Sequence, residues 1–254
     1  MISVLAWMFA LLATEAKAQV HAPSAAEFTE TWHTIDLAME TTAFFPIELT
    51  QQDFETIAKG RVAKRRIREA GPDRAMGAMW TPLNRNLVWV AILDDVHDKL
   101  VSSLSEKRLG SSAKGHKLLY QHFDLPWPIQ DRQLVVQIQN NEPIAKQTAN
   151  VLWERSWSLA DPNAMPDPDP EAVWVPVANG SWLLFPVKNG TVVVYHGRSA
   201  IGGRIPDEVV TRWALATVDE MMLHITERAA QISQHYRVDH EILMGGDGKK
   251  IYHF

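Results

Sequence analysis

Apolar residues near the end of the chain recur at helical spacing, which predicts one long amphipathic helix beginning after Pro206. Proline suits the start of a helix, and Asp207 and Glu208 follow it where the helix dipole favours acidic side chains. The apolar stripe consists of Val210, Ala214, Thr217, Val218, Met221, Ile225, Ala229 and Ile232. Another apolar surface has to cover a stripe of this length. We expect the concave side of a β-sheet to provide it.

A series of short β-rich runs precedes this helix and predicts an antiparallel sheet. Turn residues separate the runs at distances typical of hairpins. The predicted strands are 117–123, 133–139, 148–159, 172–177, 182–187 and 191–197. Closely spaced prolines and aspartates at 161–170 predict a projecting loop. Asn179-Gly180 and Asn189-Gly190 are predicted to be turns, because Asn-Gly is a strong hairpin signal.

The first half of the chain predicts helices and one hairpin. Ser24 and Glu27 have the spacing of a capping box, and an apolar series at helical spacing follows, so we expect a helix that ends before Pro46. Gly71-Pro72 lies within 57–80 and predicts a turn between two strands. Short helices are predicted over 82–95 and 96–104.

The first residues of the chain have the pattern of an export signal. An apolar run over 2–13 precedes Ala16-Lys17-Ala18, which has the small-x-small pattern of a signal-peptidase site. The run is shorter than the roughly 20 residues that a membrane-spanning helix needs. The chain contains no cysteine, although secreted eukaryotic proteins usually carry disulfides. We therefore expect a signal peptide at 1–18 and a periplasmic or secreted bacterial protein.

The charge balance argues against one class of partner. The chain has 25 Lys and Arg against 30 Asp and Glu, a net charge of −5, and removing 1–18 takes away one residue of each sign. Binding to nucleic acid depends largely on basic surfaces that neutralise phosphates. We therefore do not expect nucleic acid to be a partner.

Several segments carry a resemblance to a known family. They are the apolar run 88–95, the Pro-rich turn 125–132, the Gly-x-Trp-x-x-x-Pro strand 180–186 and the Gly-Gly-x-Ile-Pro helix start 202–206. Together with the order of elements, they make residues 50–230 similar to the START lipid-transfer domains of the Bet v 1-like (SRPBCC) superfamily. The resemblance implies an α+β helix-grip fold, in which a curved antiparallel sheet wraps around a long C-terminal helix. An extra N-terminal helix precedes it.

The resemblance also sets the expected organisation of the chain. We divide it into a signal peptide at 1–18, an N-terminal helix extension at 19–50, a START-like lipid-binding domain at 51–233 and a C-terminal tail at 234–254.

The resemblance implies a cavity between the sheet and the last helix that holds one lipid. We expect the ligand-binding residues to be Arg132, Trp182, Tyr195, Trp213, Thr217 and Met221. Arg132 could receive a carboxylate or phosphate, because its guanidinium matches such groups. The alternatives are a structural ion pair between Arg132 and Asp131 or another acid at the strand start, and ordinary core packing for the other side chains.

The sequence contains no motif that indicates catalysis, a metal site or a cofactor. It has no His-Glu-x-x-His and no Gly-x-Gly-x-x-Gly, and the segment around Ser199 lacks the second glycine of a nucleophile elbow. The leading hypothesis is noncatalytic lipid binding and transfer with transient membrane contact. Two alternatives remain open. One is a START-like cyclase or hydrolase that uses Arg132, Tyr195 or His196 on an aromatic or polyketide-like substrate. The other is an envelope interaction protein with a filled core.

Overall fold

The computed structural model describes residues 21–44, 46–94, 104–111, 116–236, 240 and 243–253. The expected signal peptide and residues 96–103 of the helix predicted over 96–104 lie outside these residues. Within the described part of the chain, no helix combines the length and the apolar character needed to cross a membrane.

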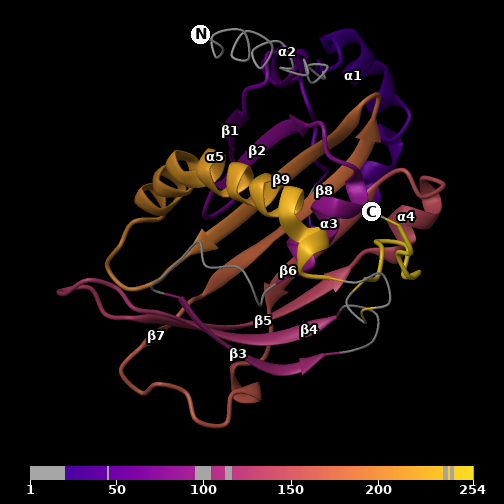
Figure 1. Ribbon diagram of the computed structural model, residues 1–254. Helices are drawn as coiled ribbons and strands as arrows, with labels where there is room; N and C mark the ends of the chain where they lie inside the picture. The colour runs from indigo at the N-terminus through magenta and orange to yellow at the C-terminus, as the bar shows by residue number, and fades with distance from the viewer. Residues whose placement is uncertain are drawn as a thin grey trace, which may run out of the picture.

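The helices and strands appear in the order expected for a helix-grip fold (Figure 1). The α-helices are α1 (Ala25–His33), α2 (Gln51–Ala58), α3 (Arg85–Leu93), α4 (Glu142–Gln147) and α5 (Asp207–Gln231), and the 3-10 helices are η1 (Asp36–Thr41), η2 (Pro162–Ala164) and η3 (Ile232–Gln234). The strands are β1 (Ala63–Ile67), β2 (Arg74–Thr81), β3 (Leu104–Ser111), β4 (Lys117–Phe123), β5 (Arg132–Asn140), β6 (Trp153–Leu159), β7 (Val173–Trp174), β8 (Val177–Val187) and β9 (Gly190–Ala200).

The strands form one sheet in the order β1-β2-β9-β8-β6-β5-β4-β3. All neighbours along this path are antiparallel, and β7 pairs with β5 in the parallel direction. The short β7 replaces β6 beside the first residues of β5, because β6 pairs only with 136–140. The α+β fold with a large antiparallel sheet and a long C-terminal helix is confirmed.

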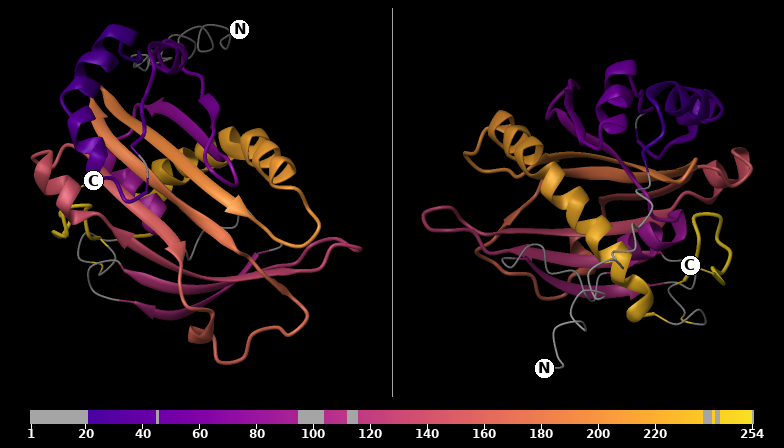
Figure 2. Two further views of the ribbon diagram at one scale, coloured as in Figure 1. Left: turned by 180° about the vertical axis from the view of Figure 1, so that it is seen from behind. Right: turned by 45° about the horizontal axis from the view of Figure 1, so that its top comes forward.

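The N-terminal helices cover the outer face of β2, β9 and β8 (Figure 2). The Ser24–Glu27 capping box is formed, since the Ser24 hydroxyl accepts from the Glu27 amide at 3.3 Å and the Ser24 amide donates to Glu27 Oε2 at 2.9 Å. Phe28 and Trp32 of α1 share a buried core with Phe185 of β8. The N-terminal segment therefore forms a layer of the fold on the side of the sheet opposite α5.

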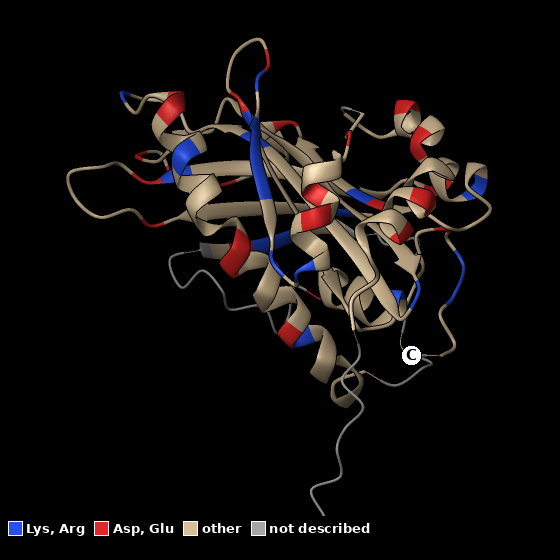
Figure 3. Cartoon of the chain, turned by 90° about the horizontal axis from the view of Figure 1, so that it is seen from above, with Lys and Arg blue, Asp and Glu red and all other residues tan. Residues whose placement is uncertain are grey.

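The opposite, inner face of the sheet carries α5 and α3. Helix α5 packs against β1, β2, β9 and α3. Lys64 of β1 lies 2.8 Å from Asp219 of α5, and Arg66 pairs with Glu208 near the start of the helix; both elements can be followed in Figure 3. The chain after α5 also packs on this side, because Leu243 is fully buried and the Trp89 indole donates to the Met244 carbonyl at 2.8 Å.

Several details differ from the sequence-based expectations. Helix α2 begins after a capping box of Thr50 and Asp53, a signal that the sequence interpretation missed. Residue 104, which was expected to end a helix, instead begins β3. The strand predicted from 148 begins at Trp153, because Ala149 and Asn150 have positive φ angles of 48° and 67° and form a turn after α4.

The two Asn-Gly pairs have different structures. Asn189 has a φ of 63° and connects β8 to β9, so this turn prediction is confirmed. The prediction was wrong for Asn179-Gly180, which lies inside β8. A side chain at position 180 would come within 2.3 Å of the Trp157 ring, so packing explains this glycine.

Candidate ligand-binding site

One row of paired residues crosses the inner face of the sheet. Directly opposed residues in antiparallel strands point to the same face, so the register identifies the side chains that share a surface. The row runs through Gly77, Tyr195, Trp182, Arg155 and Asn140, which belong to β2, β9, β8, β6 and β5. The row begins beneath α5 at Gly77. A Cβ at this position would lie 2.7 Å from the sulfur of Met222, which belongs to α5.

Aromatic rings form the central part of this face. The centroid of the Tyr195 ring lies 4.8 Å from that of the Trp182 ring and 5.6 Å from that of the Trp157 ring. The Tyr195 and Trp157 rings are nearly parallel, with an interplanar angle of 19°. Gly180 and Gly197 leave space for these rings. A Cβ at position 180 would collide with the Trp157 ring, and a Cβ at position 197 would collide with the Tyr195 hydroxyl. The glycines allow these rings to lie along the sheet, where they form a broad apolar surface.

Polar groups of the same rings are available to a ligand. Among the described residues, the Tyr195 hydroxyl and the indole N–H groups of Trp157 and Trp182 have no hydrogen-bond partner, and these side chains are partly exposed. Burial raises the pKa of Tyr195 to about 12. The Tyr195 hydroxyl therefore stays protonated at neutral pH and can donate a hydrogen bond.

A cationic side chain lies next in the row. Arg155 is 3% exposed, and its Nη1 donates to Asn140 Oδ1 at 2.6 Å. A guanidinium beside an aromatic surface is suited to binding a carboxylate or phosphate. The sequence interpretation overlooked Arg155 and Trp157. The alternation of β6 could have indicated both, because Trp153, Arg155 and Trp157 point to one face of the strand.

The inner face remains incompletely covered beyond the aromatic rings. Ile138, Leu159 and Phe123 lie on the same side of β5, β6 and β4 and are only partly buried. Apolar side chains on the inside of a sheet are normally covered by packing partners. Their partial exposure indicates apolar surface that a ligand can cover.

Three expected site residues lie on α5 in different environments. Met221 is partly buried and packs against the same buried cluster as Trp182 and Tyr195. The Thr217 hydroxyl donates to the Trp213 and Ala214 carbonyls of its own helix, at 3.2 and 3.4 Å. Trp213 is 67% exposed and does not belong to the buried cluster.

Arg132 lies at the start of β5, close to the start of α5. It is 4% exposed and donates to the carbonyls of Ile201 at 2.6 Å and Gly202 at 3.3 Å. Its Nη1 donates to the carbonyls of Gln130 and, at 3.2 Å, Asp131. The expected alternative, an ion pair with the Asp131 carboxylate, is absent from the described residues. Arg132 instead joins the turn before β5 to the segment that leads into α5.

His196 faces the other side of the sheet. Its neighbour Tyr195 points inward, whereas His196 Nε2 lies 3.0 Å from the Ser181 hydroxyl and Nδ1 lies 2.9 Å from Arg74 Nη1. Because Arg74 can only donate, Nδ1 accepts and Nε2–H donates to Ser181, which in turn donates to Glu154 at 2.6 Å. Burial lowers the pKa of His196 to about 3. This neutral histidine does not converge with Arg132 and Tyr195 on one point.

Comparisons with known proteins identify the fold. A scan against models of protein families found no match, and a search of curated protein sequences found none either. Solved structures do match. Human STARD10 aligns over 77% of this chain and 86% of its own, with a TM-score of 0.54 and 10% identity. Human StAR-related lipid transfer protein 5 covers 82% and 97% of the two chains, with a TM-score of 0.51 and 11% identity.

A bacterial protein gives a similar result. The STAR-related lipid transfer protein from Xanthomonas axonopodis aligns over 70% of this chain and 95% of its own, with a TM-score of 0.50 and 19% identity. The shared features are the large antiparallel sheet and the long C-terminal helix. The chain therefore has a START-like helix-grip fold.

Proposed function

We propose that this protein binds one lipid between the inner face of the sheet and α5 and carries it through the bacterial periplasm without changing it chemically. The observation that carries the proposal is the partly exposed aromatic surface of Trp157, Trp182 and Tyr195, which continues into apolar side chains of β4, β5 and β6. Ligand sites of this kind are mostly apolar and use a few polar groups to fix orientation.

Arg155 is the polar group best placed to orient the ligand. It lies beside Trp182 in the same row, and its charge would attract the carboxylate or phosphate of a lipid head group. The lipid chain would then cover the aromatic rings. The lipid-transfer names of the structural neighbours support this class of ligand, and the proposed export signal supports the location.

We propose the end of the molecule near the start of α5 as the membrane-facing end. Trp127 is 93% exposed and Ile129 is 39% exposed in the turn before β5, while Trp213 lies exposed on α5. The Arg132 contacts hold this turn next to the segment that begins α5. Exposed tryptophans favour the interface between water and lipid head groups.

The direct test is to purify the protein from the periplasm of the producing cell and to identify copurified small molecules by mass spectrometry. We expect one lipid per chain, and adding that lipid to the stripped protein should raise its midpoint of thermal unfolding.

Two outcomes would reject the proposal. A protein that carries no lipid, and that no added lipid stabilises, would support a filled core and an interaction role. Recovery of chemically altered products from an added aromatic or polyketide-like compound would support the enzyme alternative.

A further inference from the structure

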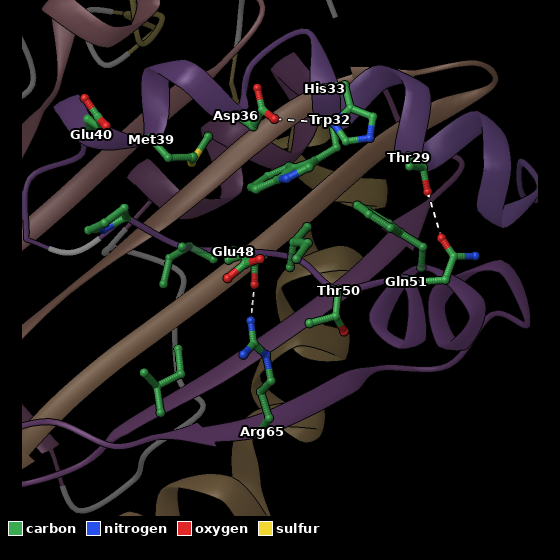
Figure 4. A pocket seen from close by; sticks show the side chains of 15 residues that line it. Thr29, Trp32, His33, Asp36, Met39, Glu40, Glu48, Thr50, Gln51 and Arg65 are labelled. Atoms are coloured by element: carbon green, nitrogen blue, oxygen red, sulfur yellow. Dashed lines mark hydrogen bonds and ion pairs between the residues drawn. The ribbon is translucent and has the colours of Figure 1, made fainter.

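We propose a second binding site, on the opposite side of the sheet from the lipid site, for a single-chain amphipathic cation such as an alkylammonium. The site is a groove of about 860 Å³ between α1, η1, the segment 46–50, α2 and β1 (Figure 4). This volume falls within the ~300–1,000 Å³ of small-molecule sites. The inference does not depend on the lipid site, because the sheet separates the two.

The floor of the groove is apolar and well ordered by its own packing. The Trp32 ring packs against the rings of Phe54 and of Phe185 in β8, with centroid distances of 6.3 Å and 5.7 Å. Met39 and Leu49 are also almost fully buried while lining the groove. A floor fixed in this way needs little rearrangement to receive an alkyl chain.

The rim of the groove carries more acidic than basic side chains. Asp36, Glu40 and Glu48 line it together with Arg65 and His33. Arg65 forms an ion pair with Asp53, because its Nε lies 3.4 Å from a carboxylate oxygen of Asp53, although this Nε makes no hydrogen bond among the described residues. Its Nη2 donates to the Glu48 carbonyl. The groove therefore has a net negative charge.

Two of these carboxylates can receive a ligand cation. In the part of the chain that the structure describes, the carboxylates of Glu40 and Glu48 have no hydrogen-bond or ion-pair partner, and both residues are exposed. Asp36 pairs with His33 at 3.3 Å. An ammonium group at the rim would find free acceptors, and its alkyl chain would lie on the floor.

The edges of the groove limit its length. On one side, the Thr29 hydroxyl of α1 donates to the Gln51 side chain of α2 at 3.1 Å, as Figure 4 shows. On another side, Arg65 of β1 holds the backbone of Glu48. These bridges favour a short single-chain ligand over a long segment of another protein.

The test follows methionine methyl groups by NMR in the full mature chain. Met39 lines the groove, whereas Met221 lies on the inner side of the sheet, so the two methyl signals report the two sites separately. The probes are n-octylammonium chloride and sodium octanoate, which share a chain length and differ in charge. A Met39→Leu variant assigns the signal.

We expect octylammonium to shift the Met39 signal in a saturable manner, with an affinity at least about fivefold above that of octanoate. The double variant Glu40→Gln, Glu48→Gln should weaken octylammonium binding about fivefold. The matched control is Glu220→Gln, Glu227→Gln, which neutralises exposed acids on α5 and should leave the affinity unchanged.

Three results would overturn the inference, whatever happens at Met221. They are a Met39 signal that does not respond to octylammonium, equal affinity for both probes, and unchanged affinity in the Glu40/Glu48 double variant.

Discussion

Glycines leave space for large side chains on the inner face of this sheet. Gly77 lets α5 approach β2 closely, while Gly180 and Gly197 leave room for the rings of Trp157 and Tyr195. None of these three has a left-handed backbone, so close approach explains them better than conformational freedom does. The sequence indicated Gly180 as part of a motif, but its role depends on a neighbour in another strand.

Replacing Gly77 by alanine should destabilise the protein. The new Cβ would lie 2.7 Å from the Met222 sulfur and 2.8 Å from a Val218 methyl, and both side chains are fully or almost fully buried. We expect urea denaturation to show a loss of about 1–3 kcal/mol. The matched control is Gly110→Ala, where a Cβ meets nothing within 4 Å. Equal stability of the two variants would contradict this packing of α5 on β2.

The buried hydrogen-bond chain on the outer face links stability to pH. The pKa of His196 falls from 6.5 to about 3, chiefly through burial and secondarily through Arg74. An unfolded chain protonates His196 below pH 6.5, whereas the folded chain does not until about pH 3. Stability is therefore lost as the pH falls through this window. Glu154 has the opposite effect on stability. Burial raises its pKa, so the folded chain binds this proton more readily than the unfolded chain as the pH falls.

A His196→Gln variant should isolate the histidine contribution. The amide can still accept from Arg74 and donate to Ser181 but does not titrate. Relative to the variant, the original protein should lose about 1.4 kcal/mol of unfolding free energy per pH unit between pH 6 and 4. Denaturant unfolding at several pH values measures this. Parallel pH profiles for the two proteins would show that His196 is not kept neutral.

At the scale of elements, local signals predicted some segments better than others. Helix α5 and the β8–β9 turn were expected because their signals lie within a few residues, at Pro206 and at Asn189-Gly190. The short β7 was mistaken for a regular antiparallel strand, since its parallel pairing depends on β5 rather than on its own sequence. Residue 104, predicted to end a helix, belongs to β3 because it pairs with Phe123 of β4.

The segment that begins α5 depends on a contact from β5. Arg132 donates to the Ile201 and Gly202 carbonyls just before the helix. Replacing it with lysine removes the planar guanidinium that reaches both carbonyls. Amide exchange at Val209 and Val210, in the first turn of α5, should accelerate about tenfold.

The matched control is Arg204→Lys, which changes an exposed arginine in the same segment. It should leave exchange at Val209 and Val210 unchanged. If Arg132→Lys also leaves this exchange unchanged, Arg132 does not hold the start of the helix.

At the scale of the whole molecule, the sheet separates two apolar regions. The outer region is covered by α1, η1 and α2, with a groove between them, while the inner region exposes the rings of Trp157, Trp182 and Tyr195 between the sheet and α5. The sequence predicted the layer that α5 forms on the inner face and two of these rings, but not the outer layer. It did not predict the row that ends at Arg155 and Asn140, because the register of distant strands depends on tertiary pairing.

The exposed aromatic end predicts how lipid exchange depends on the membrane. Trp127→Ala should slow lipid transfer between vesicles several-fold, because an interfacial anchor is lost, while the amount of lipid bound remains unchanged. A fluorescent-lipid transfer assay and the bound lipid measured by mass spectrometry check the two parts. Equal transfer rates would contradict membrane contact through this turn.

Photocrosslinking tests the central claim, that one lipid lies on the inner face beneath α5, most directly. A fatty acid with a diazirine on its chain is bound to the stripped protein and illuminated, and the labelled peptides are identified by mass spectrometry. We predict label in β6, β8, β9 and α5, around Trp157, Trp182, Tyr195 and Met221. Label confined to the outer helices or the exposed surface, with none on these strands, would contradict the account.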